Sequence, residues 1–253
     1  MRLSIALITF NEATRLPACL ASVAFADEVV IVDNGSTDGT VELARSLGAR
    51  VLQTPDWPGF GVQKNRAVDM ARGDWVFSID ADEQVTPALQ AQILRAIAAP
   101  PGKACAAYTV NRRSSYCGQY MRHSGWYPDR VLRLFRRGEA RFSDDRVHES
   151  LQTSGAIGRL EADLLHQSFA DFETVLDKVN RYSTASAQSL LQRGKRGSVG
   201  KAVRHAIWAF VRTYVLKRGF LDGQLGLALA ISNAEGTYYR YLKLWLAQRD
   251  GKA

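Results

Sequence analysis

The chain has 253 residues, enough to bury the core of one large α/β domain or of one domain with an appendage. Its apolar content of 46% and charged content of 23% exclude wholesale disorder. The formal charge of +8 predicts an anionic partner, either a nucleotide, a nucleic acid or an acidic membrane surface. Three widely spaced cysteines without a C-x-x-C pair argue against a disulfide scaffold or a zinc site. Residues 1–11 are too short an apolar run for a signal peptide, so we expect a cytosolic protein.

Strand and helix patterns alternate through the N-terminal part of the chain. Continuous apolar runs predict strands at 3–9, 28–33, 49–55 and 74–80, and helical spacing predicts helices at 12–24, 40–47 and 61–72. We expect Asn11 to cap the first helix and Ser36 or Thr37 to cap the second. Unbroken apolar strands that alternate with helices indicate a mostly parallel sheet with helices on both faces.

The pattern changes after a predicted helix at 87–98. The runs AAYTVNRR and RVLRLFRR have strand character without long helices between them, which predicts a mixed edge added to the parallel sheet. From residue 171 onward the chain has helical spacing, with stretches at 199–220 and 225–245. We therefore expect an α/β domain over residues 1–170, followed by a helical region over 171–253.

Acidic residues stand where two of the expected strands end. Asp33 ends the second strand, and Asp80, Ala81 and Asp82 end the fourth, within the stretch FSIDADEQVT. Ligands of open α/β sheets bind outside the carboxyl ends of the strands, and paired carboxylates there suit a divalent cation that carries phosphate groups. In the alternative interpretation, Asp80 caps a helix and Asp82 is a solvated loop residue. We expect Glu83 to cap or orient the turn before the helix at Pro87, not to bind metal.

Two other enzyme classes fit these motifs less well. A phosphohydrolase of the haloacid dehalogenase type would place its D-x-D after the first strand, where this chain has TFNE. A dinucleotide-binding fold would need glycine in the first turn, and ITFNEATR has none. A metal phosphohydrolase that uses the D-x-D stays open as an alternative.

The segments ALITFNEATRLPACLASV, EVVIVDNGSTDGT and KNRAVDMARGDWVFSIDADE resemble the donor half of a family 2 glycosyltransferase with the GT-A fold. The resemblance implies that residues 1–85 bind a nucleotide-sugar and residues 105–170 bind the acceptor. It implies that Asp33 contacts the base, that Asp80 lies near the ribose, and that Asp82 binds Mg²⁺ or Mn²⁺ at the diphosphate. The other donor-binding residues that it implies are Thr9, Asn11, Glu12, Gly35, Ser36, Lys64, Asn65, Arg66 and Ala81. Arg66 has the alternative role of a surface helix residue.

The segments WYPDRVLRLFRRGEARFSDDRVHESL, LLHQSF and KVNRYS resemble a bacterial branch of this family that includes lipopolysaccharide core β-1,4-glucosyltransferases. The resemblance implies an inverting transfer of a hexose, with UDP-glucose as donor and a lipid-linked sugar of the inner core as acceptor. Glu149 is the expected base, with Asp145 as the second choice and Asp144 or Asp129 after it. The expected acceptor-binding residues are Trp126, Asp129, Arg133 and His148. His166 is the expected second metal ligand, or else a structural residue.

Basic and aromatic residues are mixed in the stretch Val199–Phe220. Such a helix is typical of a segment that lies on an anionic membrane, and its charges forbid a spanning helix. In the alternative interpretation, the same aromatics pack on the catalytic domain. The sequence has no recognisable nucleic-acid-binding motif, so we expect a protein at the inner face of the cytoplasmic membrane. Two further alternatives stay open, a different cell-envelope or polyprenyl-linked acceptor and a non-catalytic nucleotide- or lipid-binding module.

Overall fold

The structure is a computed structural model that describes residues 2–100, 105–143 and 150–250. The chain divides into two compact units. The sheet unit comprises residues 1–112 and 129–166, and the helical unit comprises residues 113–128 and 167–253. Each is described below by itself.

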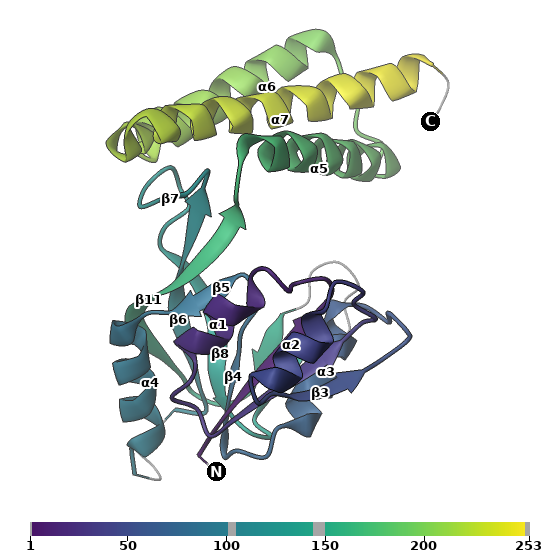
Figure 1. Ribbon diagram of the computed structural model, residues 1–253. Coiled ribbons are helices and arrows are strands. Elements are labelled where there is room, and N and C mark those ends of the chain that lie inside the picture. The colour runs from purple at the N-terminus through teal and green to yellow at the C-terminus, as the bar shows by residue number, and fades with distance from the viewer. Residues whose placement is uncertain (1, 101–104, 144–149, 251–253) are drawn as a thin grey trace. The chain divides into compact units, whose positions relative to one another are not determined.

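The first half of the sheet is parallel, as predicted. Its strands lie in the order β3-β2-β1-β4 (Figure 1). The register pairs Thr9 of β1 with Asp33 of β2. The four strands are β1 (Leu3–Thr9), β2 (Glu28–Asp33), β3 (Arg50–Gln53) and β4 (Trp75–Ser78). The helices between them are α1 (Leu16–Ser22), α2 (Thr40–Ser46) and α3 (Phe60–Met70).

The second half of the sheet is antiparallel where it meets β4. β8 pairs with β4 and the order continues β8-β6-β11-β5, which confirms the predicted mixed extension. These strands are β5 (Glu83–Val85), β6 (Ala107–Tyr116), β8 (Asp129–Arg136) and β11 (Ile157–Phe169). A separate hairpin joins β9 (Ala140–Phe142) to β10 (Leu151–Thr153). The helix α4 (Pro87–Ala98) has the predicted bounds and is capped by Thr86, whose hydroxyl accepts from the Leu89 amide at 3.2 Å.

Two apolar clusters lie on the two faces of the sheet. Leu16 of α1 and Leu89 of α4 belong to one cluster, and Ala67 and Val68 of α3 belong to the other. Leu16 and Leu89 are fully buried, and burying a leucine stabilises the fold by about 1.5–3 kcal/mol. Helices therefore cover both faces, as the strand–helix alternation predicted.

Both expected helix caps at the N-terminal strand ends are wrong. Helix α1 begins only at Leu16 and has no side-chain cap, while Asn11 accepts a hydrogen bond from the Thr37 amide at 2.9 Å. Ser36 donates to Asp33 instead of capping α2. The two loops bind each other, so their polar side chains are used between loops and not at helix ends.

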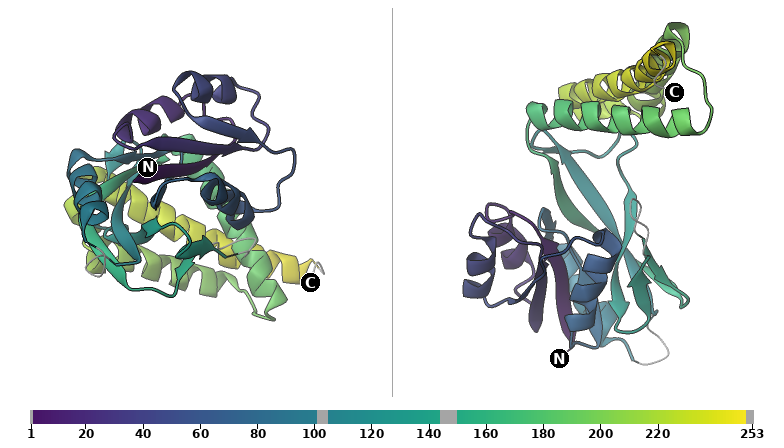
Figure 2. Two further views of the ribbon diagram at one scale, coloured as in Figure 1. Left: turned by 90° about the horizontal axis from the view of Figure 1, so that it is seen from below. Right: turned by 90° about the vertical axis from the view of Figure 1, so that its right-hand side faces the viewer.

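The helical unit contains three long helices and the tip of the sheet. These are α5 (Phe172–Gln192), α6 (Val199–Val211), α7 (Gly223–Arg249) and the short strand β7 (Gln119–Tyr120). α7 packs along both α5 and α6 (Figures 1 and 2). A π-helical turn (Arg212–Leu216) and a 3₁₀ turn (Gly219–Asp222) connect α6 to α7. In the part of the chain that the structure describes, none of the helices combines the length and apolarity needed to cross a membrane.

Candidate active site

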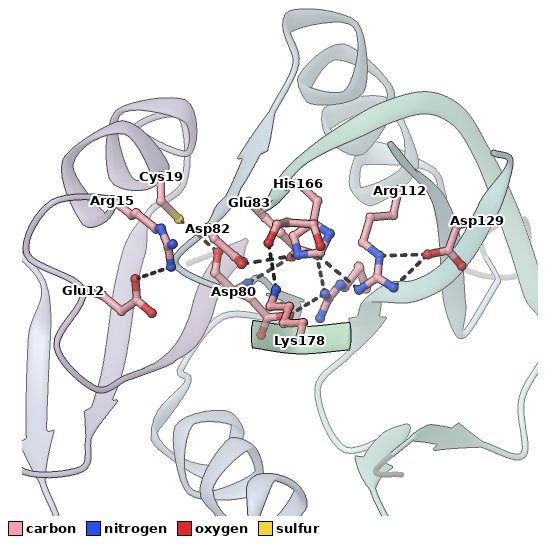
Figure 3. A network of polar contacts seen from close by, with 12 residues as sticks. Glu12, Arg15, Cys19, Asp80, Asp82, Glu83, Arg112, Asp129, His166 and Lys178 are labelled. Atoms are coloured by element: carbon pink, nitrogen blue, oxygen red, sulfur yellow. Dashed lines mark hydrogen bonds and ion pairs between the residues drawn. The ribbon is translucent and has the colours of Figure 1, made fainter. Parts of the chain in front are cut away.

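The D-A-D segment forms a tight turn just beyond β4. The Glu83 amide donates to the Asp80 carbonyl at 2.9 Å, which closes the turn. The carboxyl ends of β1, β2 and β4 meet at the same edge because all three strands run parallel. Figure 3 shows the side chains of this turn facing His166 of β11 and the N-terminal loop that carries Glu12. The acidic residues that the sequence places at strand ends are therefore together at the edge where α/β sheets bind ligands.

Asp80 is held by two cations. Its Oδ1 lies 3.1 Å from Lys64 Nζ, and its Oδ2 accepts from Arg133 Nη2 at 2.7 Å. Burial alone would raise the pKa of Asp80, but the Arg133 and Lys64 charges outweigh it and hold the pKa well below its usual range. Asp80 is thus an ionised carboxylate that two cations hold in place. The alternative that Asp80 caps a helix is wrong, because Thr86 caps α4.

Glu83 is the residue of this site whose importance the sequence did not reveal. Its side chain is fully buried, accepts from Arg133 Nη2 at 2.6 Å, and accepts from the Asp80 amide at 3.0 Å. Burial raises the pKa of Glu83 against the pull of Arg133, and the nearby Asp80 charge raises it further. The expectation that Glu83 orients the turn is confirmed by its bond to the Asp80 amide. No local sequence signal marks this burial, because it depends on Arg133 of a strand distant in sequence.

Arg133 is buried in β8 and links both carboxylates. Burial lowers the pKa of its guanidinium, but Glu83 and Asp80 more than compensate and raise the pKa above its ordinary value. The expected role of Arg133 in acceptor binding stays a prediction; in this structure its Nη2 donates to the chain's own carboxylates Asp80 and Glu83. Arg137, which follows β8, donates to the Gly73 carbonyl at 3.0 Å.

Asp82 and His166, the two expected metal ligands, lie side by side. Asp82 Oδ2 is 3.3 Å from His166 Nε2, so Asp82 is not simply a solvated loop residue. Two ligand atoms bound next to each other on one Mg²⁺ are about 3 Å apart, so this pair fits a shared divalent cation. Among the described residues, no group of three His, Cys, Asp or Glu side chains is arranged to hold a metal ion. The remaining ligands would have to be water and phosphate oxygens, as is usual for Mg²⁺.

Asp33 organises the neighbouring turn. It is fully buried; its Oδ2 accepts from the Thr9 hydroxyl at 2.8 Å, and its Oδ1 accepts from the amides of Gly35 at 3.0 Å and Ser36 at 2.9 Å. Next to it, Asn34 has a buried Oδ1 without a hydrogen-bond partner in the described residues. An orphaned acceptor of this kind calls for a partner, and a ligand N–H is one. The sequence analysis did not select Asn34.

The expected nucleotide-binding residues of α3 have different surroundings. Asn65 is buried and exchanges two hydrogen bonds of 2.9 Å with the backbone of Phe142, so its amide fastens β9 to α3. Arg66 forms a surface pair with Asp56, at 2.9 and 2.7 Å. Only Lys64 points to the D-A-D turn, and its ammonium lies 5.4 Å from the centre of the Phe142 ring.

Glu12 and Ala81 complete the donor-side residues. The Glu12 amide donates to the Thr40 hydroxyl at 2.9 Å, and its carboxylate lies 3.5 Å from Arg15. Burial raises the pKa of Glu12, Arg15 opposes the rise, and the Asp82 charge adds to it. Ala81 is buried inside the turn. A further negative charge therefore faces Asp82 from the N-terminal loop, which favours a cation between them.

Several expected acceptor-side residues cannot be placed. Glu149, Asp145, Asp144 and His148 lie outside the described residues. The residues on either side of them are hydrogen-bonded to each other: the Ser143 amide donates to the Ser150 carbonyl at 2.9 Å. Asp129 accepts two hydrogen bonds from Arg112, at 2.8 and 2.9 Å. Trp126 belongs to the helical unit, where it packs on Tyr116 and Phe169.

The half-parallel, half-mixed sheet with a D-A-D turn at the end of β4 defines the GT-A class of nucleotide-diphospho-sugar transferases. The family described as Glycosyl transferase family 2 matches residues 4–164, and the chain belongs to this family. It is a family 2 glycosyltransferase, as the motif resemblance predicted, and this membership favours a transferase over a D-x-D phosphohydrolase.

Relatives match nearly the whole chain. A Rickettsia typhi protein described as an uncharacterized glycosyltransferase is 32% identical over 96% of this chain and 86% of its own length. The lipopolysaccharide core biosynthesis glycosyltransferase LpsC of Rhizobium meliloti is 31% identical over 94% of this chain and 93% of its own. The solved structure of S. aureus TarS 1-349 in complex with UDP-GlcNAc is 16% identical, with a TM-score of 0.52 over 99% of this chain and 92% of that one. That likeness supports the fold alone.

Proposed function

We propose that the chain is an inverting, metal-dependent hexosyltransferase. It transfers glucose from UDP-glucose to a sugar of a lipid-linked acceptor, the inner core of lipopolysaccharide. The observation that carries this proposal is the pairing of Asp82 with His166 beside a fixed, charged Asp80 at the end of β4. The choice of acceptor is supported by the similarity to LpsC, whose name assigns it to lipopolysaccharide core biosynthesis.

The donor binds across the carboxyl ends of the parallel strands in this proposal. Asp33 and the orphaned Asn34 Oδ1 face the base, and Asp80 accepts from the ribose hydroxyls. Lys64 and Arg133 keep Asp80 ionised and fixed, so the carboxylate needs no rearrangement when the sugar arrives. Such preorganised polar groups bind the donor in one orientation.

Asp82 and His166 would hold the divalent cation, Mg²⁺ or Mn²⁺. The cation supplies charge neutralisation for the diphosphate that leaves the sugar. The chain's own contribution is to keep the carboxylate and the imidazole 3.3 Å apart, on a turn and a strand that are both anchored in the sheet. The register places His166 opposite Glu83 in the β11–β5 pair, which fixes the imidazole beside the turn.

The acceptor hydroxyl attacks the anomeric carbon from the side opposite the diphosphate. A carboxylate takes the hydroxyl proton as the new C–O bond forms, and the bond between the anomeric carbon and the diphosphate oxygen breaks, releasing UDP. We propose Glu149 as this base, with Asp145 as the alternative. This choice of base is supported by the position of β9, the strand that precedes it in the sequence. Phe142 of β9 is hydrogen-bonded to Asn65 and lies near Lys64, and Lys64 pairs with Asp80.

Residues 171–253 form the membrane-associating region in this proposal. The helical unit has 16 Lys and Arg against 6 Asp and Glu, a formal charge of +10, whereas the sheet unit has 17 against 19, a charge of −2. All the excess positive charge thus resides in the helical unit. Large apolar side chains are exposed there beside the cations, including Ile207, Trp208, Leu216 and Phe220. Exposed apolar residues next to cations suit an anionic lipid surface.

Transfer to a defined acceptor tests the proposal. The purified protein is incubated with UDP-glucose, Mn²⁺ and lipopolysaccharide truncated at the inner core, and the product is analysed by mass spectrometry and NMR. We expect the mass of one added hexose and a β-anomeric signal from the α-linked donor. A retained α-configuration would contradict inversion. Transfer only to a polyprenyl-linked acceptor would move the proposal to that alternative, and donor binding without any transfer would favour the non-catalytic module.

A further inference from the structure

The helical unit contains a cavity to which the proposed transfer mechanism assigns no role. It has a volume of about 230 Å³ and lies between α5, α7 and the sheet tip that carries Trp126. Every residue that lines it belongs to the helical unit. Since one water occupies ~30 Å³ of liquid, this space suits a phosphoryl or carboxyl group together with a ring or a short apolar segment.

Aromatic side chains form one wall of the cavity. The ring centres of Trp126 and Phe169 are 5.6 Å apart, and those of Tyr116 and Trp126 are 6.0 Å apart with an edge-to-face angle of 80°. The Tyr116 hydroxyl is hydrogen-bonded to the Ser232 hydroxyl at 2.8 Å, which fixes the ring. A fixed aromatic wall of this kind is a surface for an apolar group or for the flat face of a ring.

Two cationic side chains also line the cavity. Lys178 and Arg240 line the cavity, and no Asp or Glu lines it. The Lys178 ammonium donates to the Ser168 carbonyl at 2.8 Å and lies 4.3 Å from the centre of the Phe169 ring. Arg240 Nε is buried without a hydrogen-bond partner, and the described residues give Arg240 no carboxylate partner. A buried guanidinium N–H without a partner calls for an anionic acceptor.

Gly236 in the middle of α7 keeps the cavity open. A Cβ built there would meet only Val179 Cγ1, at 3.6 Å, which is an ordinary contact. Packing therefore does not require glycine, although glycine in a helix costs about 1 kcal/mol relative to alanine. A larger side chain at this position would enter the cavity.

We infer that this cavity is a second binding site, for an anionic group carried on an apolar or ring-shaped body. The anion, a phosphate or carboxylate, binds Arg240 and Lys178, and the body lies on the wall of Trp126, Tyr116 and Phe169. Two sources share this chemistry, the headgroup region of an anionic lipid and a soluble phosphorylated sugar. The inference rests on the helical unit alone and holds whatever reaction the sheet unit performs.

Calorimetric titration of the full chain tests the site with four probes. They are a short-chain phosphatidic acid below its micelle concentration, the matching phosphatidylcholine, glucose 6-phosphate and inorganic phosphate. We expect the phosphatidic acid or the sugar phosphate to bind at least tenfold more tightly than inorganic phosphate, and the tighter of the two identifies the source. The inference would be overturned if neither the phosphatidic acid nor glucose 6-phosphate bound more tightly than inorganic phosphate. So would phosphatidylcholine binding as tightly as phosphatidic acid.

Variants then locate the binding in the cavity. Gly236→Leu and Arg240→Gln should each weaken the tighter probe at least tenfold, and Arg240→Lys should restore part of the loss. Arg204→Gln removes an exposed cation of α6 that does not line the cavity, so it should bind as the wild type does. Gly236→Ala fits the space and should bind normally. If Gly236→Leu fails to fold, the Arg240→Gln variant still tests the site. Unchanged affinity of Arg240→Gln for the tighter probe would overturn the inference.

Discussion

The two units of this protein handle charge in opposite ways. In the sheet unit, the partly exposed carboxylate of Asp80 and the buried carboxylate of Glu83 are compensated by Arg133 and Lys64 of the same unit. In the helical unit, cations outnumber carboxylates, and Lys243, for example, donates within the described residues to neutral oxygens of Asn180, Ser183 and Thr184. Burial lowers the pKa of Lys243, as expected of a cation without a carboxylate beside it.

Because of this difference, the charges of the two units have different effects. Charges that are paired inside the chain fix a site and add little to its long-range field, whereas unpaired charges attract an external anion. The sheet unit therefore has the character of a preorganised reaction site, and the helical unit has the character of a surface for anionic partners.

Loss of the proposed base should have the largest effect. We expect Glu149→Gln to bind donor normally and to lower kcat by about 10²–10⁴-fold, the usual contribution of a general base. Steady-state transfer rates and donor titrations measure the two effects separately. Asp145→Asn is the matched control and should retain activity. An active Glu149→Gln enzyme together with an inactive Asp145→Asn enzyme would instead identify Asp145 as the base.

Removing Arg133 should destabilise the sheet unit severely. Arg133→Met leaves Asp80 and Glu83 without their shared cation, and breaking a buried ion pair costs about 3–5 kcal/mol of the free energy of unfolding. Arg130→Met removes a partly exposed pair with Glu161 and should cost only about 0–1 kcal/mol. Urea denaturation compares the two variants. Equal costs would mean that the buried network does not organise the site.

The metal ligands should matter for donor binding. Asp82→Ala should weaken the affinity for UDP-glucose in the presence of Mn²⁺ by roughly 10–100-fold or more, because removing a ligand should cost at least as much as the 10–100-fold typical of outer-shell changes. His166→Gln should have a smaller effect in the same direction. Calorimetry with and without Mn²⁺ measures both. Unchanged affinity of Asp82→Ala with Mn²⁺ present would refute the metal assignment.

The ion pair of Asp80 predicts a dependence of stability on pH. Its pKa is lowered in the folded state, so its stabilising contribution is complete above the ordinary value of 3.8 and is lost as the pH falls below it. The difference in unfolding free energy between the wild type and Asp80→Asn should therefore be constant from pH 7 to about pH 5 and shrink toward pH 3. A difference that grows on acidification would contradict the pairing.

Single cations of the helical unit should have the smallest effects. Each Lys or Arg near an anionic membrane contributes about 1 kcal/mol, so Arg212→Gln should weaken binding to anionic vesicles by several-fold. Vesicle flotation at low and high salt measures this binding, with neutral vesicles as the control. A wild-type protein that does not float with anionic vesicles at low salt would contradict the membrane proposal.

The sequence predicted what depends on local pattern. The parallel half of the sheet follows from continuous apolar runs, and the bounds of α4 agree with the helix predicted at 87–98. The D-A-D turn was identified because a polar motif directly follows a buried strand. Both the fold class and the family agree with these predictions.

Features that depend on tertiary contacts were not predictable. Glu83 and Arg133 are 50 residues apart, and nothing local signals that a glutamate becomes fully buried on an arginine of a distant strand. The expected helix caps failed for the same reason, because Asn11 and Ser36 are used between two loops that are distant in sequence. The motif resemblance implied a donor-binding role for Asn65, whereas in the structure its amide fastens α3 to β9.

The central claim is that the strand-end carboxylates bind a nucleotide-sugar with the help of a divalent cation. A thermal-shift panel of nucleotide-sugars, with Mn²⁺ and with a chelator, tests it most directly. We predict that UDP-glucose raises the melting temperature more than the other donors, and does so with Mn²⁺ but not with the chelator. A panel in which no nucleotide-sugar stabilises the protein, or in which Mn²⁺ makes no difference, would contradict the claim.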